Sequence, residues 1–503
     1  GVQSVAVLMD GTVKTYNVTP STVDNTSATL TSTDPYYWTN HNDITVTAWW
    51  PYTAGETTPP AVKVKANQST QKDFEGSDLI VADGQTVTYG SPTLRFTHRT
   101  ARVTIVLTDY TEGLASVQLT GLSTENDNPD KITPYDKGSN TYTAIVAPQS
   151  VAAGTAFITC TFTNGKTFVY KMKNATDWQV GGEYTYTVSL AAAKDLGYTI
   201  ESDGSYTVTS ADGLMNIAEL VNGGKSDINI TLDTDIDLTG KDWTPIGTNY
   251  DNSYKGTFDG GGHTITGLTV TTYDKYAGLF GWLNSAGTVK NVVMEGVQIT
   301  NNHSSGFAGG VVGNSWGTIE NCSVSGSVNG EVYVGGVVGK QTSGSMTGCS
   351  SSATVKGTVN VGGVAGESWG SMTACYATGN VTLEIYPGKD ISGGGVVGFK
   401  GGNSVLACYA TGNVNSKGSS TGNVHIGGLF GYKYATAIAC YWKNNKEQGI
   451  GYNKEGIVTE ATKVDGTDVT WQKAVDAMNT ALQNAGSEWR YELKGALPTL
   501  RKQ

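Results

Sequence analysis

Apolar residues in the second half of the chain recur in a four-residue pattern, in which two apolar residues stand between two glycines. The pattern occurs six times, at intervals of 32, 26, 27, 32 and 33 residues. A repeat of this length that is rich in Gly and Val indicates stacked β-strand units, each forming one coil of a β-solenoid. The copies are Gly278–Gly281, Gly310–Gly313, Gly336–Gly339, Gly363–Gly366, Gly395–Gly398 and Gly428–Gly431.

A cysteine occupies a matching position after five of the six copies, and Val292 occupies it after the first. A position that accepts Cys or Val is a buried site for a small apolar side chain, so we expect an interior ladder of unpaired thiols. A disulfide between coils remains an alternative, whereas the lack of any Cys-x-x-Cys pair disfavours a metal site. These residues are Cys322, Cys349, Cys375, Cys408 and Cys440.

The first 195 residues alternate apolar and polar positions with the period of a β-strand. Ile44, Val46 and Ala48 alternate with threonines, and Asp10-Gly11 is a two-residue turn signal between apolar runs. Strands of this length with frequent turns are typical of β-sandwiches. We therefore expect one sandwich over residues 1–93 and a second over residues 94–195.

Two segments have helical spacing instead. Residues 211–222 carry apolar residues at helical intervals, with Ser210 as a plausible N-cap, and residues 471–485 repeat this pattern in the tail. A solenoid must cover the apolar faces of its terminal coils. We therefore predict a parallel β-helix over residues 196–442 with helical caps, the second of them within a C-terminal cap over residues 443–503.

Bulk composition excludes several function classes. The chain has 503 residues and a net charge of −11, and it carries no basic cluster, which argues against nucleic acid or an anionic membrane as a partner. No apolar run approaches the roughly 18–20 residues that a membrane-spanning helix needs, so we predict no transmembrane segment. Charged residues are only 15%, which suits β-structure rich in turns.

The repeats and the segment before them resemble the GLUG-motif proteins, whose name describes a Gly-Leu-apolar-Gly repeat. The matching segments that precede the repeats are Leu232–Leu238, Trp243–Gly247 and Gly256–Ile265. The resemblance covers about residues 203–503. It implies a right-handed parallel β-helix on a bacterial surface protein, and it implies no particular ligand.

The first half resembles the fimbrillin-like proteins of Bacteroidetes pili. Five segments occur in the order of that family: Val46–Tyr52, Asp78–Ala82, Leu94–Ile105, Gln118–Leu122, and Trp178 ahead of Gly182–Tyr186. The resemblance implies two transthyretin-like β-sandwiches of a pilus subunit. It also implies export as a lipoprotein, proteolytic trimming, and assembly with other pilus subunits by strand donation.

Aromatic residues recur at fixed offsets from the repeated glycines. Trp316, Trp369 and Tyr434 stand three residues after the closing glycine of their repeats, and Trp282, Phe399 and Tyr432 stand directly after theirs. If the coils stack in register, these rings line one edge, with the two tryptophans at the third position about 10 Å apart. Flat rings among Asn, Ser and Glu suit a sugar-binding surface. For these rings alone the favoured interpretation is that they cover the turns and protect the stack, and a ligand platform is the alternative.

Catalysis is a competing reading, because parallel β-helices also carry polysaccharide lyases and glycoside hydrolases. Glycosidases need paired carboxylates, and the repeats are nearly bare of them; His303, His425 and Glu367 stand isolated in the sequence. We predict no catalytic site and no cofactor.

Three alternating carboxylates precede the repeats. Asp233, Asp235 and Asp237 share one face of a strand and are weak candidates for a calcium site. A solvated outer face is the favoured interpretation, and we predict no metal.

These observations together predict an all-β protein with two transthyretin-like β-sandwich domains followed by a right-handed parallel β-helix with helical caps. The leading hypothesis is a non-enzymatic adhesin, a pilus tip or accessory subunit on a fimbrium attached to the outer membrane of a Gram-negative bacterium. Its expected partners are other pilus subunits and a host or microbial surface glycan or matrix protein. A polysaccharide-processing β-helix enzyme and a ligand-free structural stalk are the alternatives.

Overall fold

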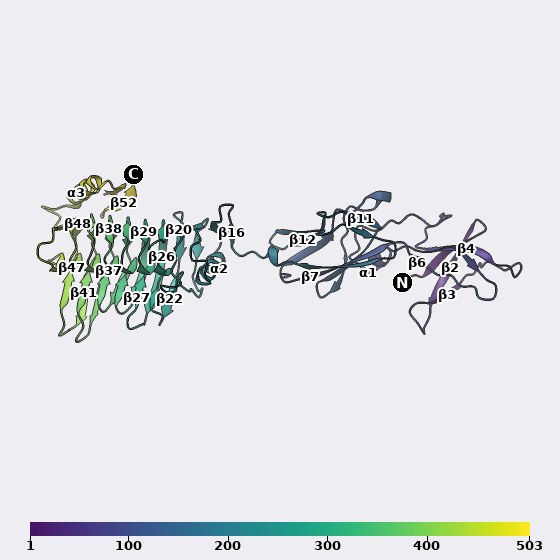
Figure 1. Cartoon of the computed structure of the whole chain (residues 1–503), viewed down its shortest axis with the longest axis horizontal. Helices are drawn as coiled ribbons and strands as arrows, with labels where there is room; N and C mark the ends of the chain where they lie inside the picture. The colour runs from purple at the N-terminus through teal and green to yellow at the C-terminus, as the bar shows by residue number, and fades with distance from the viewer. The chain divides into compact units, whose positions relative to one another are not determined.

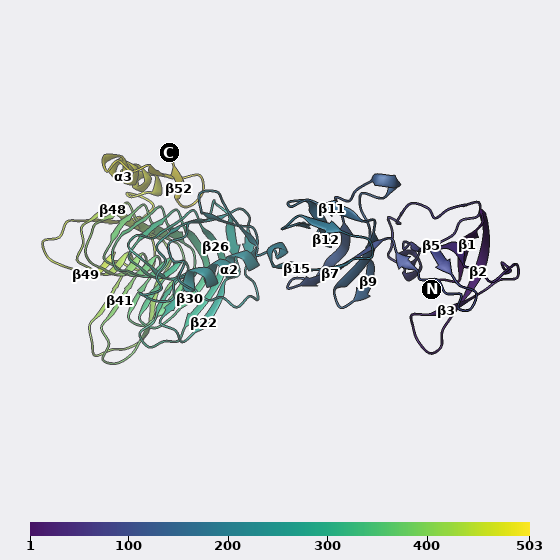
Figure 2. The same cartoon turned by 45° about the vertical axis from the view of Figure 1, so that its right-hand side comes forward.

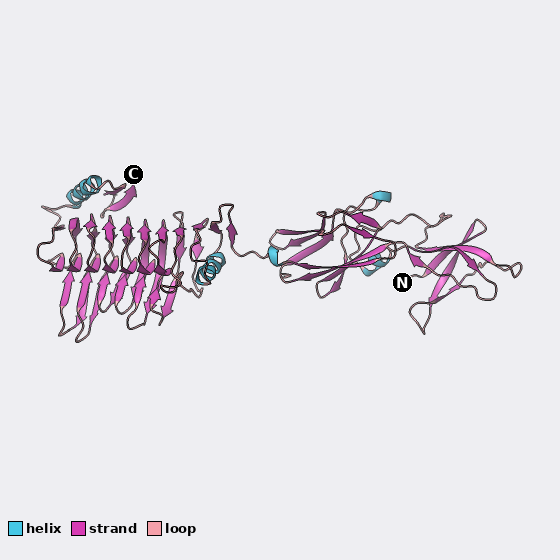
Figure 3. Cartoon of the chain, in the orientation of Figure 1, coloured by secondary structure: helices cyan, strands magenta, loops and turns pink.

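The computed structural model describes residues 1–503, which form two compact units, Gly1–Lys194 and Asp195–Gln503 (Figure 1). The all-β class is confirmed, because strands make up most of the regular structure (Figure 3). The α-helices are α1 (Gln71–Glu75), α2 (Ala211–Asn222) and α3 (Trp471–Asn484), and η1 (Glu125–Asp127) and η2 (Ala191–Ala193) are short 3-10 turns. None of these helices is long and apolar enough to cross a membrane.

The first region of unit 1 is a single antiparallel sheet of six strands, in the order β3-β2-β1-β4-β5-β6. The Asp10-Gly11 turn joins β1 to β2, and both residues have the positive φ that a tight hairpin of this kind needs. Val46 and Ala48 lie in an apolar cluster on one face, and Trp49 lies in the cluster on the other. The strands are β1 (Ser4–Met9), β2 (Thr12–Pro20), β3 (Ala28–Thr31), β4 (Ile44–Trp50), β5 (Ile80–Val87) and β6 (Thr97–His98).

The second region of unit 1 contains three small sheets, in the orders β15-β7-β10-β9, β13-β12-β8 and β11-β14. Its core includes Ile105, Phe157 and Trp178, all with 1% exposure or less. The strands are β7 (Ala101–Thr108), β8 (Leu114–Leu119), β9 (Tyr135–Gly138), β10 (Thr141–Val146), β11 (Gln149–Val151), β12 (Ala156–Phe162), β13 (Thr167–Lys171), β14 (Thr176–Trp178) and β15 (Glu183–Ser189).

The connection between β4 and β5 belongs structurally to the second region. Val64 lies in the core of that region, and its backbone N–H donates to the side chain of Asn128 at 2.9 Å. The buried side chain of Gln68 both donates to the carbonyl of Ile145 and accepts from its N–H, each at 2.8 Å. These paired bonds tie the two regions of unit 1 together.

Unit 2 is a stack of parallel coils in register, as predicted (Figure 1). In one coil, β27, β28, β29 and β30 follow each other, and each pairs with its counterpart in the next coil. The six-stranded sheet comprises β23 (Tyr276–Ala277), β27 (Phe307–Gly309), β31 (Tyr333–Gly335), β36 (Asn360–Gly362), β41 (Ile391–Gly394) and β46 (Val424–Gly427). The seven-stranded sheet comprises β24 (Phe280–Leu283), β28 (Val312–Ser315), β32 (Val338–Gln341), β37 (Ala365–Ser368), β42 (Val397–Lys400), β47 (Phe430–Lys433) and β49 (Ile450–Asn453).

The remaining strands of the coils form one long sheet of 22 strands. They are β16 (Tyr198–Ile200), β17 (Tyr206–Val208), β18 (Ile230–Leu232), β19 (Ile236–Asp237), β20 (Thr257–Asp259), β21 (Thr264–Thr266), β22 (Thr269–Thr272), β25 (Thr288–Lys290), β26 (Val293–Asn301), β29 (Thr318–Glu320), β30 (Ser323–Asn329), β33 (Ser345–Thr347), β34 (Ser350–Ser351), β35 (Thr354–Gly357), β38 (Ser371–Thr373), β39 (Tyr376–Ala377), β40 (Val381–Ile385), β43 (Val405–Leu406), β44 (Tyr409–Ala410), β45 (Val414–Gly418), β48 (Ala437–Trp442) and β50 (Thr459–Lys463).

The repeated glycines mark the corner between the six-stranded and seven-stranded sheets. A Cβ on Gly363 would lie 2.2 Å from the carbonyl oxygen of Gly395 in the next coil, and a Cβ on Gly366 would lie 2.5 Å from the backbone nitrogen of Val334. Neither glycine has a positive φ. Close approach of neighbouring backbones, rather than an unusual backbone angle, therefore requires glycine here.

The five repeat cysteines form the predicted interior ladder. All are free and at most 1% exposed, and they belong to the continuous apolar core of the coils. Burial raises the pKa of the Cys322, Cys349 and Cys375 thiols well above the usual value, so these side chains are uncharged core residues.

The two expected caps lie in different places. Helix α2 closes the first coil, because Leu214, Ile217 and Val221 belong to the same apolar core as the coils. The C-terminal segment instead covers a flank of the coils, where α3 and the hairpin of β51 (Trp489–Glu492) and β52 (Thr499–Lys502) contact several stacked turns (Figures 1 and 2).

Side-chain size explains this position of the C-terminal segment. The turn residue before each ladder cysteine has a positive φ: it is Asn321 in an early coil, but Gly348, Ala374, Ala407 and Ala439 in later ones. The small residues leave room for the rings of the C-terminal segment, and the hydroxyl of Tyr491 donates to the carbonyl of Ala407 at 2.7 Å. The far end of the stack of coils is formed by β49 and β50, which are the last strands of their sheets.

Candidate ligand-binding surface

Three rows of aligned residues run from coil to coil on unit 2, and we call them together the aromatic strip. The central row lies on the seven-stranded sheet: Trp282, Asn314, Lys340, Glu367, Phe399, Tyr432 and Tyr452. The second row lies on the six-stranded sheet: Tyr276, Phe307, Tyr333, Asn360, Ser392 and His425. The turn row follows the seven-stranded sheet: Trp316, Thr342, Trp369, Gly401, Tyr434 and Lys454.

The first coils of the strip carry one aromatic cluster. The ring centroid of Trp282 lies 4.9 Å from that of Tyr276, 5.7 Å from that of Tyr250 and 6.1 Å from that of Trp316. Phe307 continues the cluster, 4.9 Å from Tyr276. Trp316 is 37% exposed and Tyr250 is 61% exposed, so the cluster presents ring faces to solvent.

The last coils carry a second aromatic cluster. Phe399 lies 5.6 Å from Trp369 and 5.1 Å from Tyr432, and its ring is nearly parallel to that of Tyr432, at 6°. Tyr432 in turn lies 4.5 Å from Tyr452 and 5.1 Å from His425. Trp369 is 41% exposed. Stacked rings of this kind hold each other in fixed orientations, which lowers the entropy lost when a ligand binds.

A polar centre separates the two clusters, and Glu367 is its hub. One carboxylate oxygen accepts from the indole N–H of Trp369 at 2.7 Å and from Lys340 at 2.9 Å, and the other accepts from Asn360 at 2.7 Å. The ammonium of Lys340 also lies 4.8 Å from the ring centroid of Tyr333. Both oxygens of the carboxylate are therefore occupied by protein donors, and the Glu367–Lys340 pair carries no net charge.

This arrangement suits binding better than hydrolysis. Glu367 is the one carboxylate in the three rows, whereas glycoside hydrolysis uses a pair of carboxylates on either side of the bond. Its side chain is only 9% exposed and positions the ring of Trp369. The strip offers exposed ring faces with hydroxyl and amide groups between them, which is the chemistry of carbohydrate recognition.

A buried polar row lies directly beside the central row and supports the turns that carry the exposed rings. The Lys400 side-chain nitrogen lies 2.7–3.3 Å from four backbone carbonyl oxygens, those of Ser368, Gly370, Gly401 and Asn403, which share its N–H groups. Burial lowers the pKa of Lys400 to about 7. Because two of these carbonyls flank Trp369 in the chain, Lys400 helps to fix the turn from which that ring projects.

The six aromatic residues singled out from sequence all lie on the strip, but in two clusters rather than one row. Trp282 and Trp316 share the first cluster, and Thr342 stands between Trp316 and Trp369 in the turn row. Sequence reasoning missed the second row. The recurrence of Phe307, Tyr333 and His425 three residues before a repeat glycine could have revealed it, whereas Tyr250 lies in an opening loop with no such signal.

The three candidate aspartates do not assemble a metal site. Asp235 accepts from the backbone of Thr264 at 3.0 Å and lies 3.3 Å from the ring of His263, while Asp237 accepts from the backbone of Thr239 at 2.9 Å. No group of three or more His, Cys, Asp or Glu side chains in the chain is arranged to hold a metal ion. The carboxylates of Asp235 and Asp237 stabilise turns of the opening coils.

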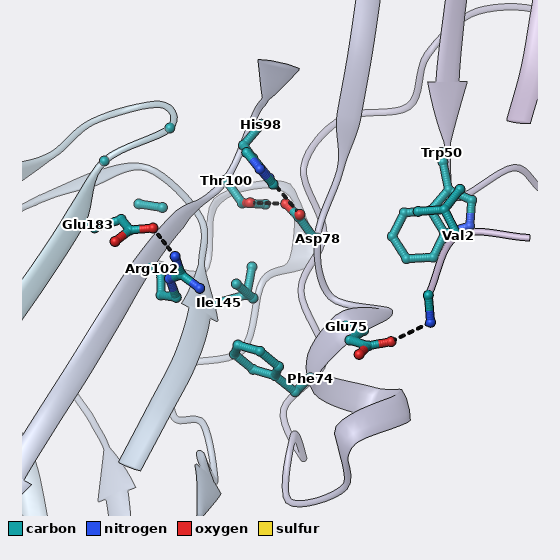
Figure 4. A pocket seen from close by; sticks show the side chains of 14 residues that line it. Val2, Trp50, Phe74, Glu75, Asp78, His98, Thr100, Arg102, Ile145 and Glu183 are labelled. Carbon is teal, nitrogen blue, oxygen red and sulfur yellow. Dashed lines mark hydrogen bonds and ion pairs between the residues drawn. The ribbon is translucent and has the colours of Figure 1, made fainter. Parts of the chain in front are cut away.

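Unit 1 contains a cavity of about 260 Å³ (Figure 4). On its wall His98 bonds Asp78 at 2.6 Å, and the Thr100 hydroxyl donates to the other oxygen of the same carboxylate. The hydroxyl is thus engaged by the aspartate and not by the histidine, so this trio lacks the base-to-nucleophile contact of a hydrolytic triad. An Arg102–Glu183 ion pair completes the polar wall.

Comparison with known proteins confirms both family resemblances at the level of segments. Residues 4–210 match the model of the fimbrillin-like family, and residues 306–329 and 330–356 match the GLUG motif. The chain thus joins a fimbrillin-like region to GLUG repeats. The fimbrillin-like match covers less than half of the chain, and the GLUG matches fall on the coils from β27 to β35.

Two curated relatives match part of the chain. Halomucin from Haloquadratum walsbyi is 43% identical over 105 residues, which are 21% of this chain and 1% of that protein. A candidate Gly-rich membrane protein from Evansella cellulosilytica is 34% identical over 129 residues, which are 24% of this chain and 14% of that protein. The chain therefore spans only a small part of the length of the curated relatives it matches.

Solved structures of two Bacteroides proteins are distantly similar. A candidate immunoglobulin A1 protease from Bacteroides ovatus has a TM-score of 0.46 at 20% identity and covers 60% of this chain and 93% of its own. A candidate cell adhesion protein from Bacteroides uniformis has a TM-score of 0.31 at 19% identity, covering 38% and 87% respectively. At this degree of overlap the structures assign neither an activity nor a ligand to this chain.

Proposed function

We propose that this chain is a non-enzymatic adhesin of a bacterial fimbrium, which binds a surface glycan through the aromatic strip of unit 2. The fimbrillin-like match over residues 4–210 supports the fimbrial part. The observation that carries the binding part is the exposure of Trp316 and Trp369, at 37% and 41%, within two ordered aromatic clusters on one series of stacked coils.

The physical argument rests on what a sugar offers to a protein. One face of a pyranose ring presents C–H groups, which stack on an aromatic ring, and its rim presents hydroxyls, which need hydrogen-bond partners. The strip supplies both: exposed tryptophans at two levels, and Thr342, Asn360 and Lys340 between them. A surface built only to cover the turns would have no need of polar groups held between the two clusters.

The fimbrillin-like region supplies the link to a pilus. In this proposal it joins other pilus subunits by strand donation, and the solenoid projects as the binding head at a tip or accessory position. A tip position suits a subunit with a large C-terminal repeat unit, because no further subunit has to polymerise beyond it. The protein would then lie on the surface of a Gram-negative bacterium, in a fimbrium attached to the outer membrane.

A glycan array probed with the full chain tests the binding part. The comparison is between the wild type, the Trp316→Ala/Trp369→Ala double variant, and Tyr386→Ala, which removes an exposed tyrosine outside the strip. We expect saturable binding that the double variant loses and the control keeps. Binding to matrix proteins but to no glycan would show that the ligand is a protein. Turnover of a bound polysaccharide would contradict the adhesin proposal and support an enzyme. The absence of any binding would support a ligand-free structural stalk.

Mixing the full chain with pilus subunits tests the fimbrial part separately. Strand donation produces complexes that survive mild denaturation, because each inserted strand completes a sheet of its neighbour. Incorporation of the chain into such complexes is the expected result. Failure to incorporate would refute the pilus assignment whatever the array shows.

A further inference from the structure

We infer that the glycan bound by the strip is an extended, β-linked polysaccharide whose chain runs along the stacking direction, with about one sugar for each coil. This inference rests on the proposed function and narrows it from a glycan to one shape of glycan. The relevant observation is that the binding groups are arranged as rows in strict register, and not around a pocket.

The first step is the repeat distance. Stacked parallel strands are about 4.8 Å apart, so the rows offer one side chain at each such step. A pyranose ring with its β-linkage advances by close to the same distance in an extended chain. Over the length of the strip, successive sugars can therefore stay close to equivalent positions of successive coils.

The second step is the length of the strip. The central row continues through all seven strands of its sheet, from Trp282 to Tyr452, which is about 29 Å at the usual strand spacing. The aromatic clusters occupy the two ends, and Asn314, Lys340 and Glu367 occupy the middle of this row. A disaccharide can contact only one cluster, whereas a chain of about six or seven sugars can stack on both and pass over the polar centre.

The third step is the openness of the site. Neither the cavity of about 260 Å³ in unit 1 nor the cavity of about 360 Å³ beneath the C-terminal segment is lined by residues of the three rows. A terminal sugar is usually recognised by enclosing it. An open strip instead accepts the interior of a chain, which enters from the side and needs no free end.

The charge of the strip bears on which chain it prefers. Glu367 neutralises Lys340 in the polar centre, and both donate or accept in fixed directions. Lysines remain only at the ends of the strip, where Lys275 lies over the ring of Phe307 at 5.6 Å and Lys454 lies over that of Tyr434 at 4.8 Å. The centre therefore suits hydroxyl and acetamido groups, and the test uses uncharged chains.

The test is a series of oligosaccharides measured against the full chain by calorimetry. The probes are β-1,4-linked glucose and β-1,4-linked N-acetylglucosamine oligomers, from the disaccharide to the octasaccharide. For the series that binds, we expect affinity to rise with length and to level off at about six or seven sugars. The long oligomer should bind about 100-fold tighter than the disaccharide, because the second cluster is engaged intramolecularly.

Single variants in the two clusters show whether one chain contacts both. Trp316→Ala and Trp369→Ala should each lower the affinity for the hexasaccharide by about tenfold or more. Each should also flatten the dependence on length, while Tyr386→Ala leaves it unchanged.

The contrary outcomes separate this inference from the proposed function. The extended-chain inference is wrong if some glycan binds but the disaccharide has the same affinity as the hexasaccharide, or if one tryptophan accounts for the whole affinity. The proposal of an adhesin would then still stand. If no oligosaccharide and no array glycan binds, both are wrong.

Discussion

The indole N–H of Trp369 donates to the carboxylate of Glu367, two residues earlier in the chain, at 2.7 Å. This contact joins the polar centre to the second aromatic cluster, because the same carboxylate also receives Lys340 and Asn360. The exposed ring is therefore held by a nearly buried charge. The proposed ligand binding and the stability of unit 2 both depend on this contact, and each can be measured separately.

Replacing Glu367 with alanine should lower both the stability of unit 2 and its affinity for the array ligand. The substitution leaves the Lys340 ammonium and two N–H groups without their partner, which costs about 1–3 kcal/mol in the free energy of unfolding. Glu367→Gln keeps an acceptor for Trp369 but loses the charge, so its effect should be smaller. Chemical denaturation measures the stability, and binding of the array ligand measures the loss of orientation of the ring.

A second carboxylate on the same unit provides the control for that prediction. Glu384 pairs with Lys356 at 2.5 Å, with side chains that are 36% and 49% exposed. Exposed pairs contribute about 0–1 kcal/mol. Glu384→Ala should therefore leave binding unchanged and stability almost unchanged. Equal effects of the two substitutions would show that Glu367 is an ordinary surface charge.

The buried ammonium of Lys400 predicts a pH dependence of stability. Burial lowers its folded pKa to about 7, while an unfolded lysine keeps a pKa near 10.4. Between these values the unfolded chain binds more protons at this position, so the free energy of unfolding rises with pH. Stability of unit 2 should therefore increase between about pH 7 and pH 8, and the increase should disappear in Lys400→Met. Above about pH 8.5 the buried thiols act in the opposite direction, because the unfolded thiols ionise there while the folded ones stay protonated, so at higher pH only the difference between the two proteins reports Lys400.

Thermal unfolding of both proteins across this pH range provides the measurement. Lys400→Met also removes the side-chain donor from four carbonyls, of which Ser368 keeps the backbone N–H of Gly401, so the variant should be less stable at every pH. Only the change of stability with pH reports the titration of Lys400. Parallel curves for the two proteins would mean that the carbonyls hold the lysine in its charged form throughout.

Much of this architecture was predictable from sequence because repeated residues carry repeated physical constraints. The glycine pairs fix the corners, and one position that accepts Cys or Val fixes the inward face, so the register of coils follows from counting. The six aromatic residues of the candidate site were found in the same way. Fixed offsets from a repeated corner place side chains on common rows without any knowledge of tertiary contacts.

What sequence did not reveal lies outside the repeat. Tyr250 reaches the first cluster from an opening loop, and the hub role of Glu367 depends on its contacts with Lys340 of the preceding coil and with Asn360 and Trp369 of its own coil. The position of the C-terminal segment depends on the size of turn residues, which a search for helical periodicity does not weigh. The turn residue is small at Gly348 and Ala407 but larger at Asn321, and this difference decides which flank of the coils the C-terminal segment covers.

Unit 2 should fold by itself. Residues 195–503 form one compact unit, and α2 closes its first coil with Leu214, Ile217 and Val221 in the shared core. A fragment of these residues should unfold in one cooperative transition, whereas a fragment starting at residue 224, which lacks β16, β17 and α2, should expose the apolar end of the first coil and aggregate. Light scattering and thermal unfolding distinguish them, and comparable behaviour of both fragments would remove the capping role of α2.

The fit between the C-terminal hairpin and the coils can be tested at one glycine with a matched control. A Cβ on Gly348 would come 2.4 Å from the ring of Trp489, and its φ is +64°. Gly388 has a similar φ of +77°, but a Cβ there would meet nothing within 4 Å. Both alanine substitutions impose the strain of a left-handed backbone, about 1–2 kcal/mol, so their difference isolates the clash.

Gly348→Ala should lose a further 1–3 kcal/mol or so through overpacking, and the hairpin should become more open to proteolysis. Limited proteolysis with mass spectrometry locates the cleavage, and denaturation gives the free energies. Alanine already occupies the equivalent turn at positions 374, 407 and 439, so the backbone itself tolerates it. Equal losses at Gly348 and Gly388, with the tail still protected, would mean that Trp489 moves aside at no measurable cost and that the flank contact is looser than its geometry indicates.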